Sequence, residues 1–150
     1  MPQVIFQNVD TTVYFTDDVR ASLRDYLDTY TLDCKKPVTL HWNKSDTHTY
    51  SVVAVSSKQV GIDIEYMKER PFEKISRRYF HHMEVTKDKE WFYRLWTCKE
   101  AYTKDKKERI ADNVGEFMFT PNKWRRVVKH YDRLTEIPNL PDDVIGYIYT

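Results

Sequence analysis

β-Branched and aromatic residues gather in short runs along the first half of the chain. These runs cover residues 11–16, 38–42, 50–56 and 60–65. Polar segments at residues 43–48 and 57–59 read as turns between the last three runs, and runs of this length bounded by turns are typical of strands. We therefore expect these segments to form a small sheet.

Three other stretches repeat apolar residues every three or four positions, which predicts helices. The first runs from Val19 to Tyr30 after a capping sequence at residues 16–18. The second begins at Pro71, and its apolar face consists of Ile75, Tyr79 and Met83. The third covers residues 87–104.

The tail of the chain adds further strand-like runs at residues 116–120, 124–131 and 144–149. Helices and strands are thus mixed without a regular strand–helix–strand alternation. This order predicts an α+β fold.

Composition narrows the class of protein. The chain has 150 residues, of which 41% are hydrophobic and 31% charged, as in an ordinary globular domain. The formal net charge of +1 disfavours a protein that binds nucleic acid through its overall charge. Cys34 and Cys98 are far apart in sequence and have no metal-binding spacing, and no apolar run reaches the length of a membrane span. We therefore expect a cytoplasmic protein that does not act at a membrane.

The strand at residues 60–65 carries the first candidate chemistry. Because side chains alternate across a strand, Val60, Ile62 and Ile64 fall on one face and Gly61, Asp63 and Glu65 on the other. The two carboxylates would lie about 7 Å apart, within reach of one divalent cation such as Mg²⁺. Gly61 on the same face is expected to leave room for a bulky ligand. The alternative is a surface strand with two solvated acids.

The helix at residues 96–104 adds charged groups at regular spacing. Glu100 could supply a third carboxylate, and Lys99 and Lys104 could bind a pyrophosphate. The alternative is an ion pair between Glu100 and Lys104 within the helix.

Two segments together resemble a known family. Residues 60–65 read VGIDIE and residues 96–104 read WTCKEAYTK, which resembles the paired signature of the 4′-phosphopantetheinyl transferases. The resemblance runs over residues 36–104 and is closest to the surfactin-type class, whose upstream motifs are similar to residues 36–37 and 47–49. Fewer residues precede VGIDIE than in most surfactin-type members, so a shortened N-terminal lobe is expected.

The resemblance implies a reaction and its reactants. Members transfer the phosphopantetheine arm of coenzyme A to a serine hydroxyl of an apo acyl or peptidyl carrier protein and release 3′,5′-ADP. Such a modification serves fatty acid, polyketide or nonribosomal peptide biosynthesis. The expected cofactor is Mg²⁺, or Mn²⁺ in its place.

The same resemblance implies roles for individual residues. Asp63, Glu65 and Glu100 would hold the metal on the pyrophosphate, and Lys99 and Lys104 would bind phosphate oxygens and assist catalysis. Glu84 would take the proton of the serine, and Lys36 and His48 would contact the phosphates of the nucleotide. The alternatives are a solvated acid for Glu84, a loop lysine for Lys36 and a turn histidine for His48.

The family fold implies two unequal lobes related by a pseudo-twofold, at about residues 1–56 and 57–150, with the active site between them. A monomer is expected rather than a homotrimer. The basic residues expected to face the carrier protein are Lys104, Lys106, Lys107 and Arg109, with Arg77 and Arg78.

Two other functions stay open. The first is a catalytically degenerate domain of the same fold that only binds a carrier protein. The second is a nucleic-acid-binding module that uses the basic residues at 77–78 and 123–129 beside aromatic side chains.

Overall fold

The computed structural model describes residues 2–30, 39–109 and 133–150 of the chain. Lys36, Cys34 and the strands expected at residues 116–120 and 124–131 lie outside these ranges. In the described part no helix is both long and apolar enough to cross a membrane.

Two antiparallel sheets form the centre of the molecule. The first has the order β1-β2-β4-β3 and the second the order β5-β7-β6. The strands of the first sheet are β1 (Gln3–Gln7), β2 (Thr11–Phe15), β3 (His41–Thr47) and β4 (Tyr50–Ser56). Those of the second are β5 (Gly61–Tyr66), β6 (Leu134–Glu136) and β7 (Val144–Tyr149).

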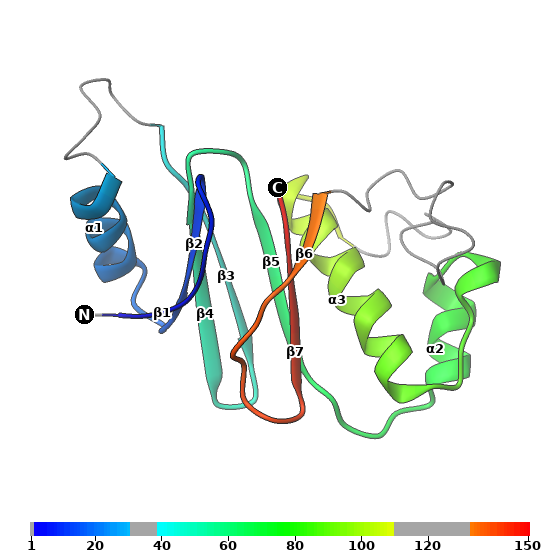
Figure 1. Cartoon of the computed structure of the whole chain (residues 1–150). Helices are drawn as coiled ribbons and strands as arrows, with labels where there is room; N and C mark the ends of the chain where they lie inside the picture. Colours follow the sequence, from blue (N-terminus) through cyan, green and yellow to red (C-terminus); the bar gives the residue numbers. More distant parts are fainter. Residues whose placement is uncertain (1, 31–38, 110–132) are drawn as a thin grey trace.

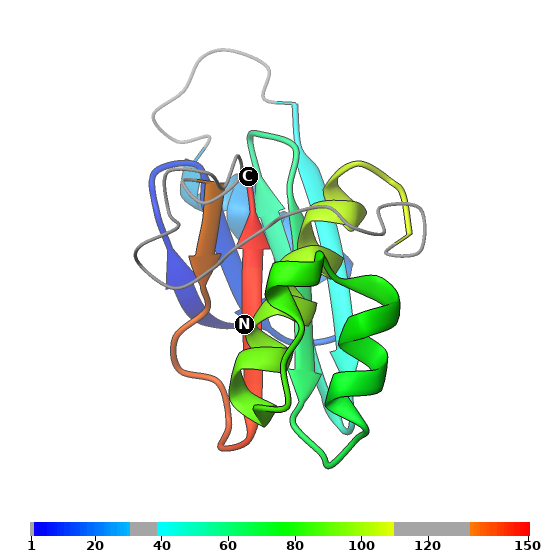
Figure 2. The ribbon, with the colours of Figure 1, turned by 90° about the vertical axis from the view of Figure 1, so that its right-hand side faces the viewer.

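Helices cover the outer face of each sheet (Figure 1). Helix α1 (Val19–Tyr30) packs on the first sheet, and α2 (Phe72–Tyr79) and α3 (Lys89–Asp105) lie on the far side of the second. Figure 2 shows α2 and α3 side by side in front of β5 and β7. A 3₁₀ turn, η1 (His82–Glu84), connects these two helices. The described elements therefore stack as helix, sheet, sheet and helices.

The alternation of side chains along the strands explains this layering. In β4, Val52 and Ala54 belong to the apolar core between the sheets, and Val53 and Val55 belong to the core under α1. In β5, Ile62 and Ile64 join the same central core, as predicted from the sequence. The opposite face of β5 is therefore turned towards α3.

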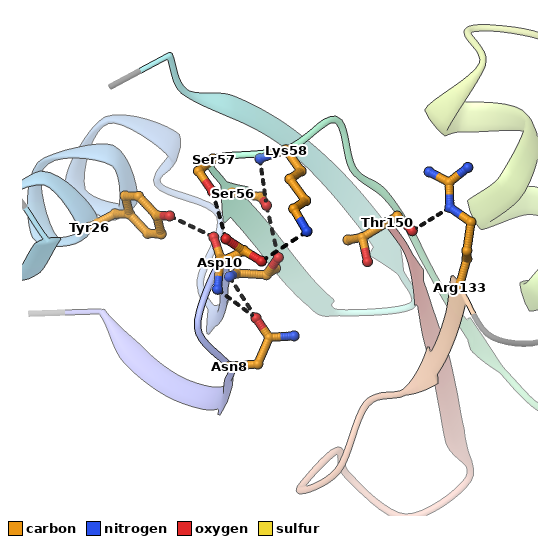
Figure 3. Close-up of polar contacts among 9 residues, drawn as sticks. Asn8, Asp10, Tyr26, Ser56, Ser57, Lys58, Arg133 and Thr150 are labelled. Atoms are coloured by element: carbon orange, nitrogen blue, oxygen red, sulfur yellow. Dashed lines mark hydrogen bonds and ion pairs between the residues drawn. The ribbon is translucent and has the colours of Figure 1, made fainter. Parts of the chain in front are cut away.

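Polar contacts fasten the turn between β1 and β2 to its neighbours (Figure 3). The Tyr26 hydroxyl on α1 donates to the Asp10 carbonyl at 2.6 Å, and Ser57 and Lys58 contact the Asp10 carboxylate. The Asn8 side chain accepts the backbone N–H of Asp10 at 3.0 Å. These bonds tie α1, β1, β2 and the link from β4 to β5 together.

The α+β fold is confirmed, and so are the helices expected at residues 19–30 and 87–104. The prediction that the second helix reaches Met83 is wrong, because α2 ends at Tyr79 and Phe80 has an extended backbone. Met83 lies in η1 with 45% of its surface exposed. Residues 43–47 were expected in a turn, but they belong to β3. The division into lobes at residues 56 and 57 stays a prediction.

Candidate active site

The faces of β5 and α3 meet along one seam, and Gly61 sets their distance. A Cβ atom on Gly61 would lie 1.9 Å from the Ala101 carbonyl oxygen and 2.7 Å from the Asp105 nitrogen, which is closer than atoms can pack. The expectation that Gly61 leaves room for a bulky ligand is therefore wrong. Its missing side chain admits the backbone of α3 instead.

The carboxylates predicted for the metal lie along this seam. Asp63 and Glu65 lie on the face of β5 that turns towards α3, and Glu100 belongs to a stripe of α3 in which Trp96 and Lys104 are its neighbours at four-residue spacing. Four helical residues rise about 6 Å and two strand residues about 6.7 Å. Side chains four residues apart on α3 therefore lie level with side chains two residues apart on β5. Trp96 accordingly lies near Glu65 and lowers the pKa of that carboxyl, and Lys104 hydrogen-bonds Asp63.

Asp63 is held through only one of its two carboxylate oxygens. Its Oδ1 accepts hydrogen bonds from Lys104 Nζ at 3.2 Å and from Ser45 Oγ at 3.3 Å. Lys104 Nζ also donates to the Ile62 carbonyl at 3.0 Å. The Oδ2 atom is buried and has no hydrogen-bond partner. A buried polar atom without a partner is a rare feature that requires an explanation.

The environment disfavours negative charge on all three carboxyls. Burial raises the pKa of Asp63 well above its ordinary value, Lys104 opposes this effect, and the charges of Glu65 and Glu100 add to it. Burial likewise raises the pKa of Glu65 against the effect of the Trp96 side chain, and the pKa of Glu100 against the charge of Lys104. A bound cation would favour the charged form of each group.

Asp63, Glu65 and Glu100 lie along one seam, but they are not arranged as a metal-binding cluster. Among the described residues, no group of three or more His, Cys, Asp or Glu side chains is arranged so that it could hold a metal ion. The Lys104 ammonium provides positive charge next to Asp63.

Glu84 and Lys99 form a second, separate unit. Lys99 Nζ lies 2.8 Å from Glu84 Oε1, and the two side chains are 4% and 0% exposed. The ammonium also lies over the Phe80 ring, 5.1 Å from its centre. Lys99, which is predicted to bind phosphate oxygens, is therefore paired with the predicted base in this structure.

His48 occupies the turn between β3 and β4. Its backbone has a positive φ of 52°, and its ring stacks on Tyr66 with 4.8 Å between ring centres. This contact places His48 beside the end of β5, beyond Glu65. Lys36, its expected partner at the nucleotide, lies outside the described ranges.

Ser45 is a neighbour of Asp63 that the sequence analysis did not identify. It lies on β3, and its hydroxyl contacts both Asp63 and the backbone N–H of Ile64. The sequence carried no signal for this contact, because residues 43–47 read NKSDT and are all polar, without the alternation of polar and apolar side chains that indicates a strand.

Comparisons with known proteins place this site in a family. Residues 59–136, more than half of the chain, match the family model described as the 4′-phosphopantetheinyl transferase superfamily. The chain belongs to this superfamily.

Individual relatives are named as transferases of the same kind. The chain is 36% identical over 86 residues to the 4′-phosphopantetheinyl transferase of Bacillus subtilis, which covers 52% of this chain and 38% of the relative. It is 32% identical over 85 residues to the 4′-phosphopantetheinyl transferase Sfp of Bacillus subtilis strain 168, covering 51% and 38%. The match to the 4′-phosphopantetheinyl transferase gsp of Aneurinibacillus migulanus is 30% over 97 residues, covering 59% and 40%. The matched regions thus span about two fifths of these relatives.

Proposed function

We propose that the chain transfers the 4′-phosphopantetheine group of coenzyme A to a serine hydroxyl of an apo acyl or peptidyl carrier protein and releases 3′,5′-ADP. The observation that carries this proposal is the alignment of Asp63, Glu65 and Glu100 with Lys104 along the β5–α3 seam, in a chain of the 4′-phosphopantetheinyl transferase superfamily.

The chemistry of the three carboxylates suits Mg²⁺, or Mn²⁺ in its place, but the described side chains are not arranged around a common metal position. Hard divalent cations prefer carboxylate oxygens, and the buried Asp63 Oδ2 has no hydrogen bond to give up. Asp63, Glu65 and Glu100 would hold the ion. When bound, it would supply positive charge to the pyrophosphate oxygens of coenzyme A.

The cationic side chains of the site have distinct proposed tasks. Lys104 is 29% exposed at its side chain and already contacts Asp63, so it would bind phosphate oxygens and stabilise the charge that grows on the leaving 3′,5′-ADP. Lys99 is paired with Glu84, so we assign it the task of fixing that carboxylate in place of the phosphate-binding role that the resemblance implies. His48 and Lys36 would contact the phosphates of the nucleotide.

The chemical step is a displacement at phosphorus. The serine oxygen forms a bond to the β-phosphorus, the bond from that phosphorus to the bridging oxygen breaks, and the electron pair leaves with 3′,5′-ADP. Glu84 would accept the proton of the serine at a carboxylate oxygen. Such a step depends mainly on positioning and charge neutralisation, which are the tasks assigned to these residues.

The setting of the reaction is also part of the proposal. We place it in the cytoplasm, where a buried free thiol such as Cys98 stays reduced, and in a monomer. The carrier could belong to fatty acid, polyketide or nonribosomal peptide biosynthesis.

The test is the mass of an apo carrier protein after incubation with the chain, coenzyme A and Mg²⁺. We expect a gain of one phosphopantetheine group and an equal amount of 3′,5′-ADP. A carrier whose acceptor serine is replaced by Ala should gain nothing, and EDTA should stop the reaction. Binding of the carrier without any mass gain would contradict the proposal and favour a carrier-binding domain without activity.

A further inference from the structure

A ladder of side-chain hydrogen bonds joins the edges of the two sheets. The backbone N–H groups of alternate β5 residues point away from β7 and are accepted by side chains of β3. The bonds run from Ile62 to Asn43 Oδ1 at 2.8 Å, from Ile64 to Ser45 Oγ at 3.0 Å and from Tyr66 to Thr47 Oγ1 at 2.9 Å. Because side chains two residues apart share one face of a strand, three side chains of β3 can serve three consecutive N–H groups along this edge.

Ser45 differs from the other two members of the ladder. Its hydroxyl also donates to Asp63 Oδ1 at 3.3 Å, and the residue is only 3% exposed. A hydroxyl can donate once and accept twice, so both bonds are compatible. Ser45 therefore holds the carboxylate of Asp63 and the peptide that follows it.

The bonds of Ser45 and Lys104 converge on the same oxygen. Both donate to Asp63 Oδ1, from β3 on one side and from α3 on the other. This arrangement fixes the rotation of the carboxylate and leaves Oδ2 without a hydrogen bond.

We infer that Ser45 is a positioning residue that orients Asp63 so that its buried Oδ2 forms no hydrogen bond and can coordinate a divalent cation. The inference rests on the proposed function, in which Asp63 is a metal ligand. Asn43 and Thr47 make equivalent bonds to β5 and join the sheets without contacting that carboxylate. The first sheet thus contributes to the geometry of a site whose proposed ligands belong to β5 and α3.

The test compares two substitutions that each remove one hydroxyl from the ladder, Ser45→Ala and Thr47→Val. Binding of Mn²⁺ alone is measured by electron paramagnetic resonance, with neither coenzyme A nor carrier present, and folding is measured by urea denaturation. Loss of a group that orients a metal ligand typically weakens affinity by about 10- to 100-fold, so we expect at least a tenfold loss for Ser45→Ala and less than about a twofold change for Thr47→Val. Both variants should unfold at lower urea concentrations than the wild type, because each leaves a backbone N–H without its acceptor.

Each contrary outcome has a definite meaning. Mn²⁺ binding by Ser45→Ala at wild-type affinity, or equal weakening in both variants, would overturn the positioning role. A wild-type protein that does not bind Mn²⁺ would overturn both the metal site and the role of Ser45. A wild-type protein that binds Mn²⁺ but modifies no carrier would refute the proposed function, and the difference between the two variants would still support Ser45 as the residue that orients Asp63.

Discussion

Asp63 carries a cost to folding that its proposed function explains. The residue is 5% exposed, and one carboxylate oxygen has no hydrogen bond. Burial raises its pKa despite the nearby Lys104, so the charged form is unfavourable in the folded chain. A carboxylate in such a position opposes folding unless a cation compensates it.

The substitution Asp63→Asn should therefore raise the stability of the metal-free protein and lower its transfer activity. We expect transfer to fall by at least about 100-fold, because several kcal/mol of transition-state stabilisation depend on a metal ligand. The free energy of unfolding without metal should rise at neutral pH, because no charge is buried. Transfer rates and urea denaturation in EDTA measure the two effects. Near-normal transfer by a folded variant would exclude Asp63 as a ligand.

The pH dependence of that stability difference has a defined sign. The folded state holds the Asp63 proton more tightly than the unfolded state, so the stability of the metal-free wild type should fall as pH rises from the ordinary value of 3.8 through the raised pKa. Asp63→Asn lacks this contribution, so its advantage should be absent at low pH and appear as pH rises through the same interval. An advantage confined to acid conditions would contradict the assignment.

At the scale of elements, a buried ion pair joins η1 to α3, and both of its members, Glu84 and Lys99, are predicted catalytic residues. Lys99 and Glu84 are almost fully buried and 2.8 Å apart. Removing one partner of a buried pair commonly costs about 3–5 kcal/mol, because the other charge loses its neutralising partner.

We expect Glu84→Gln to destabilise the fold by about 3 kcal/mol and to abolish transfer. The double variant Glu84→Gln, Lys99→Met should recover much of this stability, because the buried ammonium is also removed, but it should not recover transfer. Urea denaturation and the carrier mass assay measure these outcomes. Recovery of transfer together with stability would mean that the pair is structural and that Glu84 is not the base.

The sequence allowed the regular elements to be predicted better than their connections. The alternation in residues 60–65 correctly predicted which face of β5 joins the apolar core between the sheets, because it reflects a local period of two. The end of α2 at Tyr79 and the strand character of residues 43–47 were missed, since they depend on packing against α3 and on the ladder to β5. Contacts between elements, such as that of Lys99 on α3 with Glu84 in η1, join residues 15 positions apart and could not be derived from local spacing.

At the scale of the whole molecule, the two outer faces differ in their proposed use. Helix α1 covers the first sheet on the side opposite to α3 (Figure 1). The basic residues Lys106 and Lys107 follow the end of α3 directly and are exposed, a few residues from Lys104 in the site. They lie where an acidic carrier protein could approach the seam.

Charge reversal by Lys106→Glu and Lys107→Glu should slow transfer to the carrier at low ionic strength and flatten its salt dependence. Surface charges act mainly on the rate of encounter and are screened beyond about 8–10 Å at physiological salt, so coenzyme A affinity should not change. The matched control is Arg20→Glu with Arg24→Glu, because both arginines are exposed on α1. Equal effects of the two charge reversals on the transfer rate would mean that net charge alone causes the change, and this would contradict a docking role for Lys106 and Lys107.

The most direct test of the proposed transfer is the rate at which an apo carrier protein gains phosphopantetheine, measured by intact mass for the wild type and for Glu100→Gln. Glu100 lies on the exposed side of the seam relative to Asp63, and its substitution removes one proposed metal ligand. We predict Mg²⁺-dependent modification by the wild type and a rate at least about 100-fold lower for the folded variant. No modification by the wild type, or equal rates for both proteins, would contradict the claim that the β5–α3 seam performs this transfer.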